Sequence, residues 1–223
     1  MAEAETGIRV LLVDDQELFR AGLATIIDAQ EGMQVVGQAA DGHEALRVAD
    51  EVDPDVVLMD IRMPELDGVE ATRRLLSPER SATRERPLRV VVLTTFNLDD
   101  RAATAIRYGA SGFLLKGTTP TMLRDAIRTV HSGNAVLAPA DLASLLDTQF
   151  VAPTPPPPAY LTLTDKEREV FTAVAAGLSN TEVGGRIFAS ESTVKTHVGA
   201  ILRKLSLRDR VQIVVFAHEH DLT

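Results

Sequence analysis

Five polar side chains stand directly after apolar runs in the first half of the chain. They comprise three carboxylates, a hydroxyl and an ammonium group: Asp14, Asp15, Asp60, Thr94 and Lys116. In an open parallel sheet, functional groups gather beyond the carboxyl ends of the strands, near the point where strand order reverses. A strand order of 2-1-3-4-5 puts that point between the first and third strands. Asp14 and Asp15 are therefore predicted to lie beside Asp60.

This combination of groups is suited to phosphoryl transfer. Three neighbouring carboxylates repel one another, so the cluster needs a cation or raised pKa values. An all-oxygen site suits Mg²⁺, which often shares a phosphate ligand with the protein. With Mg²⁺ and Lys116 neutralising charge, one carboxylate would attack a phosphoryl group and form an aspartyl phosphate. The hydroxyl of Thr94 would then bind the new phosphoryl oxygens.

Each of these residues also has a simpler interpretation when taken alone. Asp15 would cap the first helix, Asp60 would open a turn, and Lys116 would be a solvated surface charge. Thr94 would satisfy backbone groups at a strand end. The occurrence of all of them after four different strands favours the phosphoryl-transfer site.

Alternating strand and helix patterns must position these groups. The apolar runs predict strands at Val10–Val13, Val35–Ala39, Val56–Met59, Val90–Leu93 and Gly112–Leu115. Helical patterns follow near residues 16–29, 43–51, 68–76, 99–108 and 120–131. Strands this apolar need both faces covered, which indicates a doubly wound α/β fold with five parallel strands. The polar segment Ser77–Pro87 is predicted to be a surface loop.

Four motifs carry a family resemblance over about residues 8–130. LLVDDQELFRAGL, VVLMDIRMPELDG, VVLTTF and GFLLK resemble the receiver domain of bacterial response regulators of the NarL/FixJ type. The resemblance implies a flavodoxin-like fold with Asp60 as phosphoacceptor. It also implies a Mg²⁺ site formed by Asp14, Asp15, Asp60 and the backbone carbonyl of Arg62.

The resemblance assigns three further roles. Thr94 matches the switch hydroxyl and Lys116 the phosphate-binding lysine. Phe113 matches the aromatic side chain that turns inward on activation, and an ordinary core aromatic is the alternative. The position is often tyrosine in the family, and phenylalanine has no hydroxyl to take part in the switch.

A proline run divides the chain. Residues 153–158 read PTPPPP, which favours a semi-rigid polyproline II spacer. We therefore predict a phosphoacceptor domain over residues 7–132, a linker over 133–160 and a helical domain over 161–223. The linker is expected to contain a short amphipathic helix at Pro139–Leu146.

The last 63 residues show four helical patterns and no strand pattern. Capping boxes at Thr164–Glu167 and Ser179–Glu182 each begin a helix. A third helix over about Glu191–Leu205 carries one apolar stripe, and a fourth runs over about Asp209–Glu219. A short turn, Phe188–Ser190, joins the second and third helices. Periodicity alone allows either a helix-turn-helix or a small helical docking module.

This segment resembles the LuxR-type four-helix DNA-binding domain. The resemblance implies that Lys195 and Thr196 face the major groove. It also implies a set of phosphate contacts: Ser192, Thr193, Arg203, Lys204 and Arg208. Phosphate contacts provide salt-dependent affinity and base-edge contacts provide specificity.

Three glycines depart from that family's pattern. Gly184 and Gly185 stand where alanine is usual, and each is expected to cost about 1 kcal/mol of helix propensity. Gly199 provides no side chain at a groove-facing position. We therefore expect weaker or less selective DNA binding, or compensation by dimerisation. His218 and His220, two residues apart, are expected to form a solvated helix end rather than a metal site.

Charge and composition agree with two modules. The net charge is −9, and eight basic residues balance eight acids in residues 161–223, so residues 1–160 carry the whole excess. The chain has no cysteine, which excludes disulfides and thiolate chemistry. No apolar run reaches the ~18 residues of a membrane span, so we expect a cytoplasmic location and no membrane partner.

Together the resemblances imply a two-component response regulator. A sensor histidine kinase would phosphorylate Asp60 and so control binding to double-stranded promoter DNA, with a homodimer forming when the protein is phosphorylated or DNA-bound. The alternative is a regulator that binds DNA independently of phosphorylation. An enzyme acting on an external metabolite is disfavoured, because no dinucleotide or P-loop glycine motif is present. Asp60-Ile61-Arg62 also departs from a D-x-D phosphatase. The chain is expected to catalyse only its own phosphoryl transfer and dephosphorylation.

Overall fold

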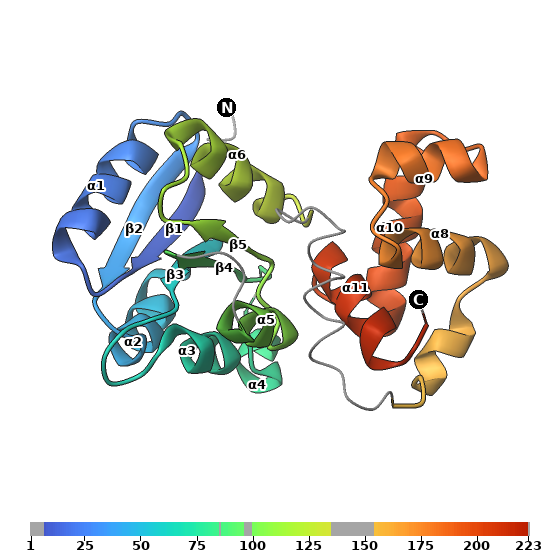
Figure 1. The fold of residues 1–223 in the computed structure, drawn as a ribbon, viewed down its shortest axis with the longest axis horizontal. Coiled ribbons are helices and arrows are strands. Elements are labelled where there is room, and N and C mark those ends of the chain that lie inside the picture. The colour runs from blue at the N-terminus through green and yellow to red at the C-terminus, as the bar shows by residue number, and fades with distance from the viewer. Residues whose placement is uncertain (1–6, 85, 96–99, 135–153, 223) are drawn as a thin grey trace. The chain divides into compact units, whose positions relative to one another are not determined.

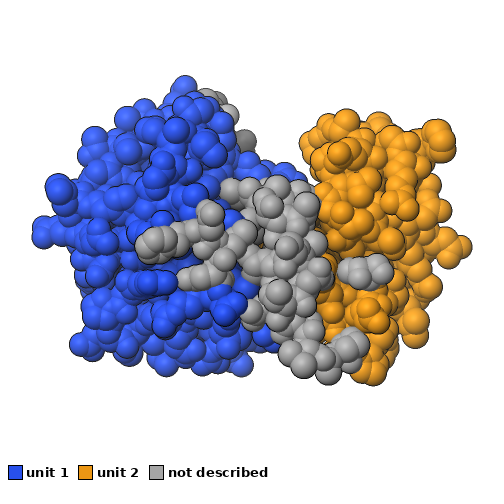
Figure 2. All heavy atoms as spheres, viewed as in Figure 1, with its two compact units in different colours: residues 1–136 blue, residues 137–223 orange. Residues whose placement is uncertain are grey.

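The computed structural model describes residues 7–84, 86–95, 100–134 and 154–222. The chain divides into two compact units, residues 1–136 and 137–223 (Figure 2). The predicted helix at Pro139–Leu146 lies outside the described residues. The finer limits of the predicted linker stay a prediction.

The first unit is built on a sheet of five parallel strands (Figure 1). The strands are β1 (Ile8–Val13), β2 (Met33–Ala39), β3 (Val56–Asp60), β4 (Arg89–Thr94) and β5 (Gly112–Leu115). Their order is β2-β1-β3-β4-β5, as the sequence predicted. All residues of β3 and β4 are buried, which explains why these strands show no polar alternation.

Helices cover both faces of this sheet. Helices α1 (Glu17–Asp28) and α6 (Pro120–His131) share one apolar core with the strands, to which Ile27 and Ile127 contribute. On the other side, α3 (Gly68–Leu75) contacts both α2 (Gly42–Val52) and α5 (Asp100–Arg107). The doubly wound prediction is confirmed.

One expected loop contains a short helix. Helix α4 (Pro78–Ala82) lies within the segment predicted as a surface loop, so the segment is at the surface but the prediction of a loop was wrong for these residues. Ser77 caps the helix by accepting a hydrogen bond from the Arg80 amide, and Pro78 occupies its first turn. The Arg80 guanidinium holds the helix in place through two 2.8 Å bonds to the carboxylate of Asp50.

The second unit is helical, as predicted. A 3-10 helix, η1 (Pro158–Thr162), precedes α8 (Asp165–Ala175), α9 (Asn180–Ile187), α10 (Glu191–Leu205) and α11 (Arg210–Glu219). Both predicted capping boxes are formed. Phe171 centres the core and makes edge contacts with Tyr160 and Phe216. The Thr154 amide donates to the carbonyl of Glu219 at 2.8 Å, so part of the predicted linker is bound to the end of α11.

The turn between α9 and α10 depends on close backbone packing. Phe188 ends α9 in the left-handed conformation with φ 53°, and Ser190 caps α10. A Cβ on Gly184 would lie 2.6 Å from the carbonyl oxygen of Ala189. The close packing of this turn therefore requires glycine at position 184. The sequence analysis expected Gly184 only to lower the helix propensity of α9. Gly185 faces open space, so for it the expected cost stands.

Among the described residues, no helix is both long enough and apolar enough to cross a membrane.

Candidate functional site

Adjacent strands bring the three predicted carboxylates together. Val13 of β1 pairs with Met59 of β3, so the residues that follow them lie side by side at the sheet edge. Carboxylate oxygens of Asp14, Asp15 and Asp60 all lie within 4.8 Å of one another. Asp14 and Asp60 are buried, whereas Asp15 is exposed to solvent.

Lys116 completes the cluster from the next pair of strands. Its amide donates to the carbonyl of Thr94 at 2.8 Å, which fixes the end of β5 against β4. Its Nζ atom lies 2.7 Å from Oδ2 of Asp14 and 2.9 Å from Oδ2 of Asp60. The side chain is only 9% exposed, so this ammonium group works in a poorly solvated environment.

Burial and the charges of neighbouring groups shift the pKa values of both Asp60 and Lys116. Burial raises the pKa of Asp60, and Asp14 adds to this rise, while Lys116 and a backbone hydrogen bond from Arg62 oppose it without cancelling it. Burial lowers the pKa of Lys116, but the carboxylates of Asp14 and Asp60 more than offset this effect. The pKa of Lys116 therefore lies above its usual value, and the lysine stays charged at neutral pH.

The structure rules out the capping interpretation of Asp15. Helix α1 is capped at Gln16 without any side-chain hydrogen bond. The local hydrogen bond is made by Asp14 instead, whose Oδ1 atom accepts from the Gln16 amide at 2.9 Å. Asp15 is thus left exposed beside Asp14 and Asp60, where its carboxylate can bind an ion.

The other predicted residues of the first unit lie in the sheet or in the loop that follows β3. Thr94 is buried at the end of β4 with 6% exposure, and Phe113 is half-buried in β5. Arg62 is exposed in the loop after Asp60. The roles predicted for these three residues stay predictions.

Three residues of this site were not found by the sequence analysis. The ring of Phe19 lies 5.0 Å from Nζ of Lys116, a cation–π contact. Arg20 donates to the backbone carbonyl of Asp14 and to Oε1 of Gln38. A Cβ on Gly68 would lie 1.9 Å from the carbonyl oxygen of Asp60, so only glycine allows α3 to approach the strand end. Phe19 and Arg20 belong to the motif DDQELFR, which could have indicated both residues.

The donor set suits a divalent cation. Three carboxylates and one ammonium group leave a formal charge of −2 in the cluster, and all candidate ligand atoms are oxygens. Hard, charged oxygen donors of this kind are the ligands that Mg²⁺ prefers. An acidic pocket of a kind able to hold Mg²⁺ is therefore present.

In the second unit, the face of α10 predicted to read DNA is open to solvent. Lys195, Thr196, Gly199 and Arg203 are exposed, while Val194, Ile201 and Leu205 on the opposite side are buried. That side packs into the helical core, which fixes which face of α10 stays available. The structure thus leaves the predicted DNA-reading face of α10 exposed to solvent.

The remaining predicted DNA contacts have local partners. Ser192 and Thr193 are exposed, and their hydroxyls hydrogen-bond to the Ser190 hydroxyl at 2.9 and 2.8 Å. Arg208 is half-buried. Lys204 is bound to Glu167 within the unit, at 2.6 Å.

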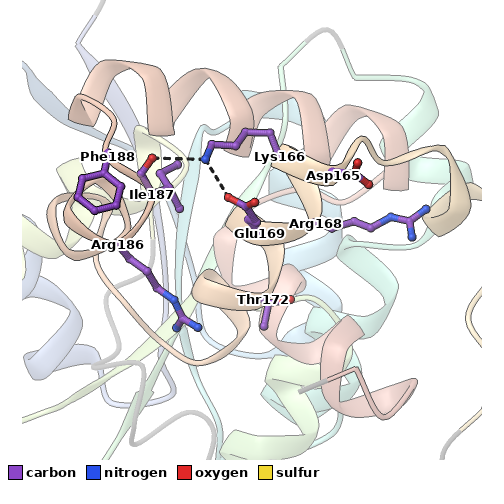
Figure 3. Close-up of a pocket in the computed structure, with 8 residues that line it drawn as sticks. All are labelled: Asp165, Lys166, Arg168, Glu169, Thr172, Arg186, Ile187 and Phe188. Atoms are coloured by element: carbon purple, nitrogen blue, oxygen red, sulfur yellow. Dashed lines mark hydrogen bonds and ion pairs between the residues drawn. The ribbon is translucent and has the colours of Figure 1, made fainter.

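A hollow of about 670 Å³ lies beside the turn that precedes α10 (Figure 3). Its wall includes Lys166, whose ammonium group binds Glu169 and the carbonyl of Ile187. Phe188 stands at its edge with 98% exposure. The sequence analysis did not indicate this hollow.

Comparison with known families decides the identity of the chain. Residues 10–128 match the response regulator receiver domain. Residues 161–217 match the bacterial regulatory proteins of the luxR family. The chain belongs to the response regulators. It combines a receiver with a LuxR-type DNA-binding domain, so the predicted family and fold are confirmed.

Relatives of this response regulator match over almost the whole chain. It is 41% identical to the uncharacterized transcriptional regulatory protein YxjL of Bacillus subtilis, covering 94% of each chain. It is 38% identical to the transcriptional regulatory protein LiaR of the same organism, covering 96% of this chain and 99% of LiaR. The crystal structure of the response regulator ChrA, from a heme-sensing two-component system, has 32% identity and a TM-score of 0.51. That match covers 98% of this chain and 100% of ChrA.

Proposed function

We propose that Asp60 is the phosphoacceptor of this response regulator and that a sensor histidine kinase supplies the phosphoryl group. The observation that carries the proposal is the position of Lys116, whose ammonium group contacts both Asp14 and Asp60 at the edge of the sheet. Among the described residues, this is the one lysine that joins two buried carboxylates. A charge-neutralising group is thus already beside the nucleophile.

The chemistry follows from these contacts. A carboxylate oxygen of Asp60 attacks the phosphorus atom, the bond to the donor breaks, and the electron pair leaves with the donor group. Lys116 neutralises charge on the transferred phosphoryl oxygens, and the hydroxyl of Thr94 donates to them in the product. Asp14, Asp15, Asp60 and the carbonyl of Arg62 would hold Mg²⁺, which supplies further charge neutralisation when bound. The protein turns over no external metabolite and catalyses only its own phosphorylation and dephosphorylation.

The output of the switch is DNA binding through α10. Lys195 and Thr196 would contact base edges from the exposed face of the helix. Phosphate contacts would come from Ser192, Thr193, Arg203 and Arg208. Phosphorylation would promote a homodimer on paired promoter half-sites in the cytoplasm, since two-fold symmetric sites match two-fold symmetric proteins.

Intact-mass measurement tests the acceptor. Wild type and Asp60→Asn are incubated with acetyl phosphate and Mg²⁺, and the expected result is one phosphoryl adduct on wild type alone. An equal adduct on both proteins would overturn the assignment of Asp60. DNA affinity is then measured with and without the adduct. An unchanged affinity would favour the alternative, a regulator whose DNA binding is independent of phosphorylation.

A further inference from the structure

The side chain of Lys204, near the end of α10, makes its contacts inside the helical unit. Its Nζ atom lies 2.6 Å from Oε2 of Glu167 and 3.1 Å from the carbonyl oxygen of Thr162. The same Oε2 atom accepts the amide of Thr164 at 2.7 Å. The Oε2 atom of Glu167 therefore connects α10 with the start of α8. The ammonium group of Lys204 also bonds to the end of η1.

The surroundings of Glu167 make this pair costly to open. Glu167 is 6% exposed, and its carboxylate also belongs to the capping box that begins α8. If Lys204 turned outward to a DNA phosphate, it would leave a buried carboxylate without its cation. The neighbouring residue differs, because Arg203 is exposed and, within the described part of the chain, binds no acid.

We propose that Lys204 is a positioning residue for DNA recognition rather than a phosphate contact. Its pair with Glu167 fixes the orientation of α10 against α8 and η1. Since η1 begins at Pro158, the last residue of the proline run, the same pair ties the DNA-reading helix to the end of that run. The inference rests on the proposed role of α10 in DNA binding.

The titration behaviour of Glu167 agrees with a strong pair. The hydrogen bond from Lys204 lowers the pKa of Glu167, and the Thr164 amide lowers it further. The carboxylate of Glu167 is thus ionised at neutral pH.

Salt dependence separates the two roles of a lysine. Each phosphate contact contributes a slope of about −0.9 to a plot of log affinity against log salt concentration. A lysine that acts only by positioning the helix contributes none, but its loss disturbs base contacts. Binding is therefore measured over a range of salt concentrations. The probes are a duplex that the wild-type protein selects from a randomised pool and a scrambled duplex of equal length.

The full-length variants Arg203→Gln, Lys204→Gln and Lys204→Arg are compared. Arg203→Gln is expected to weaken binding to both duplexes and to reduce the slope by about one unit. Lys204→Gln is expected to keep the wild-type slope while losing about tenfold in preference for the selected duplex, a typical cost of one impaired base contact. Lys204→Arg, which keeps the charge facing Glu167, is expected to restore the preference.

A double variant guards against misfolding. Glu167→Gln combined with Lys204→Gln leaves no unpaired charge, and it is expected to lose no more preference than Lys204→Gln alone, because both act through one pair. A slope reduced by Lys204→Gln as much as by Arg203→Gln would overturn the proposal, and so would an unchanged preference. If Arg203→Gln and Lys195→Gln both leave binding unchanged, the role of α10 itself fails instead.

Discussion

The Nζ atom of Lys116 lies 2.9 Å from Oδ2 of Asp60, although the two residues are 56 positions apart in the chain. Parallel pairing of β3, β4 and β5 creates this contact, because each strand ends at the same edge of the sheet. The contact places a cation beside the proposed nucleophile before any phosphoryl donor arrives. Preorganised charge of this kind needs no rearrangement during the reaction.

Replacing Lys116 by methionine tests this preorganised charge. We expect Lys116→Met to slow phosphorylation by acetyl phosphate about 10²- to 10³-fold, the usual cost of losing one charge-stabilising group. Intact mass followed over time gives the rate. Lys166→Met, which removes a surface lysine paired with Glu169, is the matched control and should react like wild type. A wild-type rate for Lys116→Met would contradict the role of the ammonium group.

Gly68 tests the close approach of α3 to Asp60. A Cβ on this residue would lie 1.9 Å from the carbonyl oxygen of Asp60, so the backbone must move in Gly68→Ala. Overpacking of this kind costs about 1–3 kcal/mol, and we expect a loss of that size in urea unfolding. Gly22→Ala is the control: Gly22 is exposed in α1 with open space around it, so this change should stabilise by up to about 1 kcal/mol. Equal effects of the two changes would refute the packing argument.

The sequence predicted the acidic site because it depends on a general rule. Parallel strands in the order 2-1-3-4-5 bring strand ends together, so residue types at strand ends were enough to group Asp14, Asp60 and Lys116. Helix α4 escaped prediction because its five residues give no periodic pattern, although Ser77 and Pro78 carry a capping signature. The Lys204–Glu167 pair escaped because it joins residues 37 positions apart on different helices, and only tertiary packing brings them into contact.

Two adjacent glycines of α9 test the helix-turn-helix packing. We expect Gly185→Ala to stabilise the helical unit by about 1 kcal/mol, because Gly185 faces open space and alanine favours the helix. Gly184→Ala is expected to destabilise it, since the new methyl group would lie 2.6 Å from the carbonyl oxygen of Ala189. Thermal unfolding of the two variants gives the comparison. If both changes stabilised the helical unit, the carbonyl group of Ala189 would be able to move away from the new methyl group without cost, and the packing argument would be wrong.

Gly199 tests which face of α10 meets DNA. Nothing lies within 4 Å of a Cβ placed on it, and the residue is exposed next to the predicted groove-facing positions. Gly199→Lys should therefore strengthen binding and steepen the salt slope by about one unit. Thr172→Lys adds the same charge at an exposed position of α8 and is expected to leave the slope unchanged. Equal effects of both lysines would show that net charge, rather than the face of α10, controls binding.

Acid sensitivity of the helical unit follows from Glu167. Its pKa is lowered in the folded state by Lys204, so its contribution to stability is present above the ordinary value of 4.5. That contribution is lost as the pH falls through the lowered pKa, because protonation breaks the pair. We expect the free energy of unfolding of wild type to fall more steeply below about pH 4.5 than that of Glu167→Gln. Hydrogen exchange of α8 and α10 amides across this range measures the difference.

The control for this prediction is Glu191→Gln. Glu191 is an exposed acid whose pKa is also lowered, by Lys195, and its replacement should keep most of the wild-type slope. A slope for Glu167→Gln as steep as that of wild type would show that the Glu167–Lys204 pair contributes no pH-dependent stability.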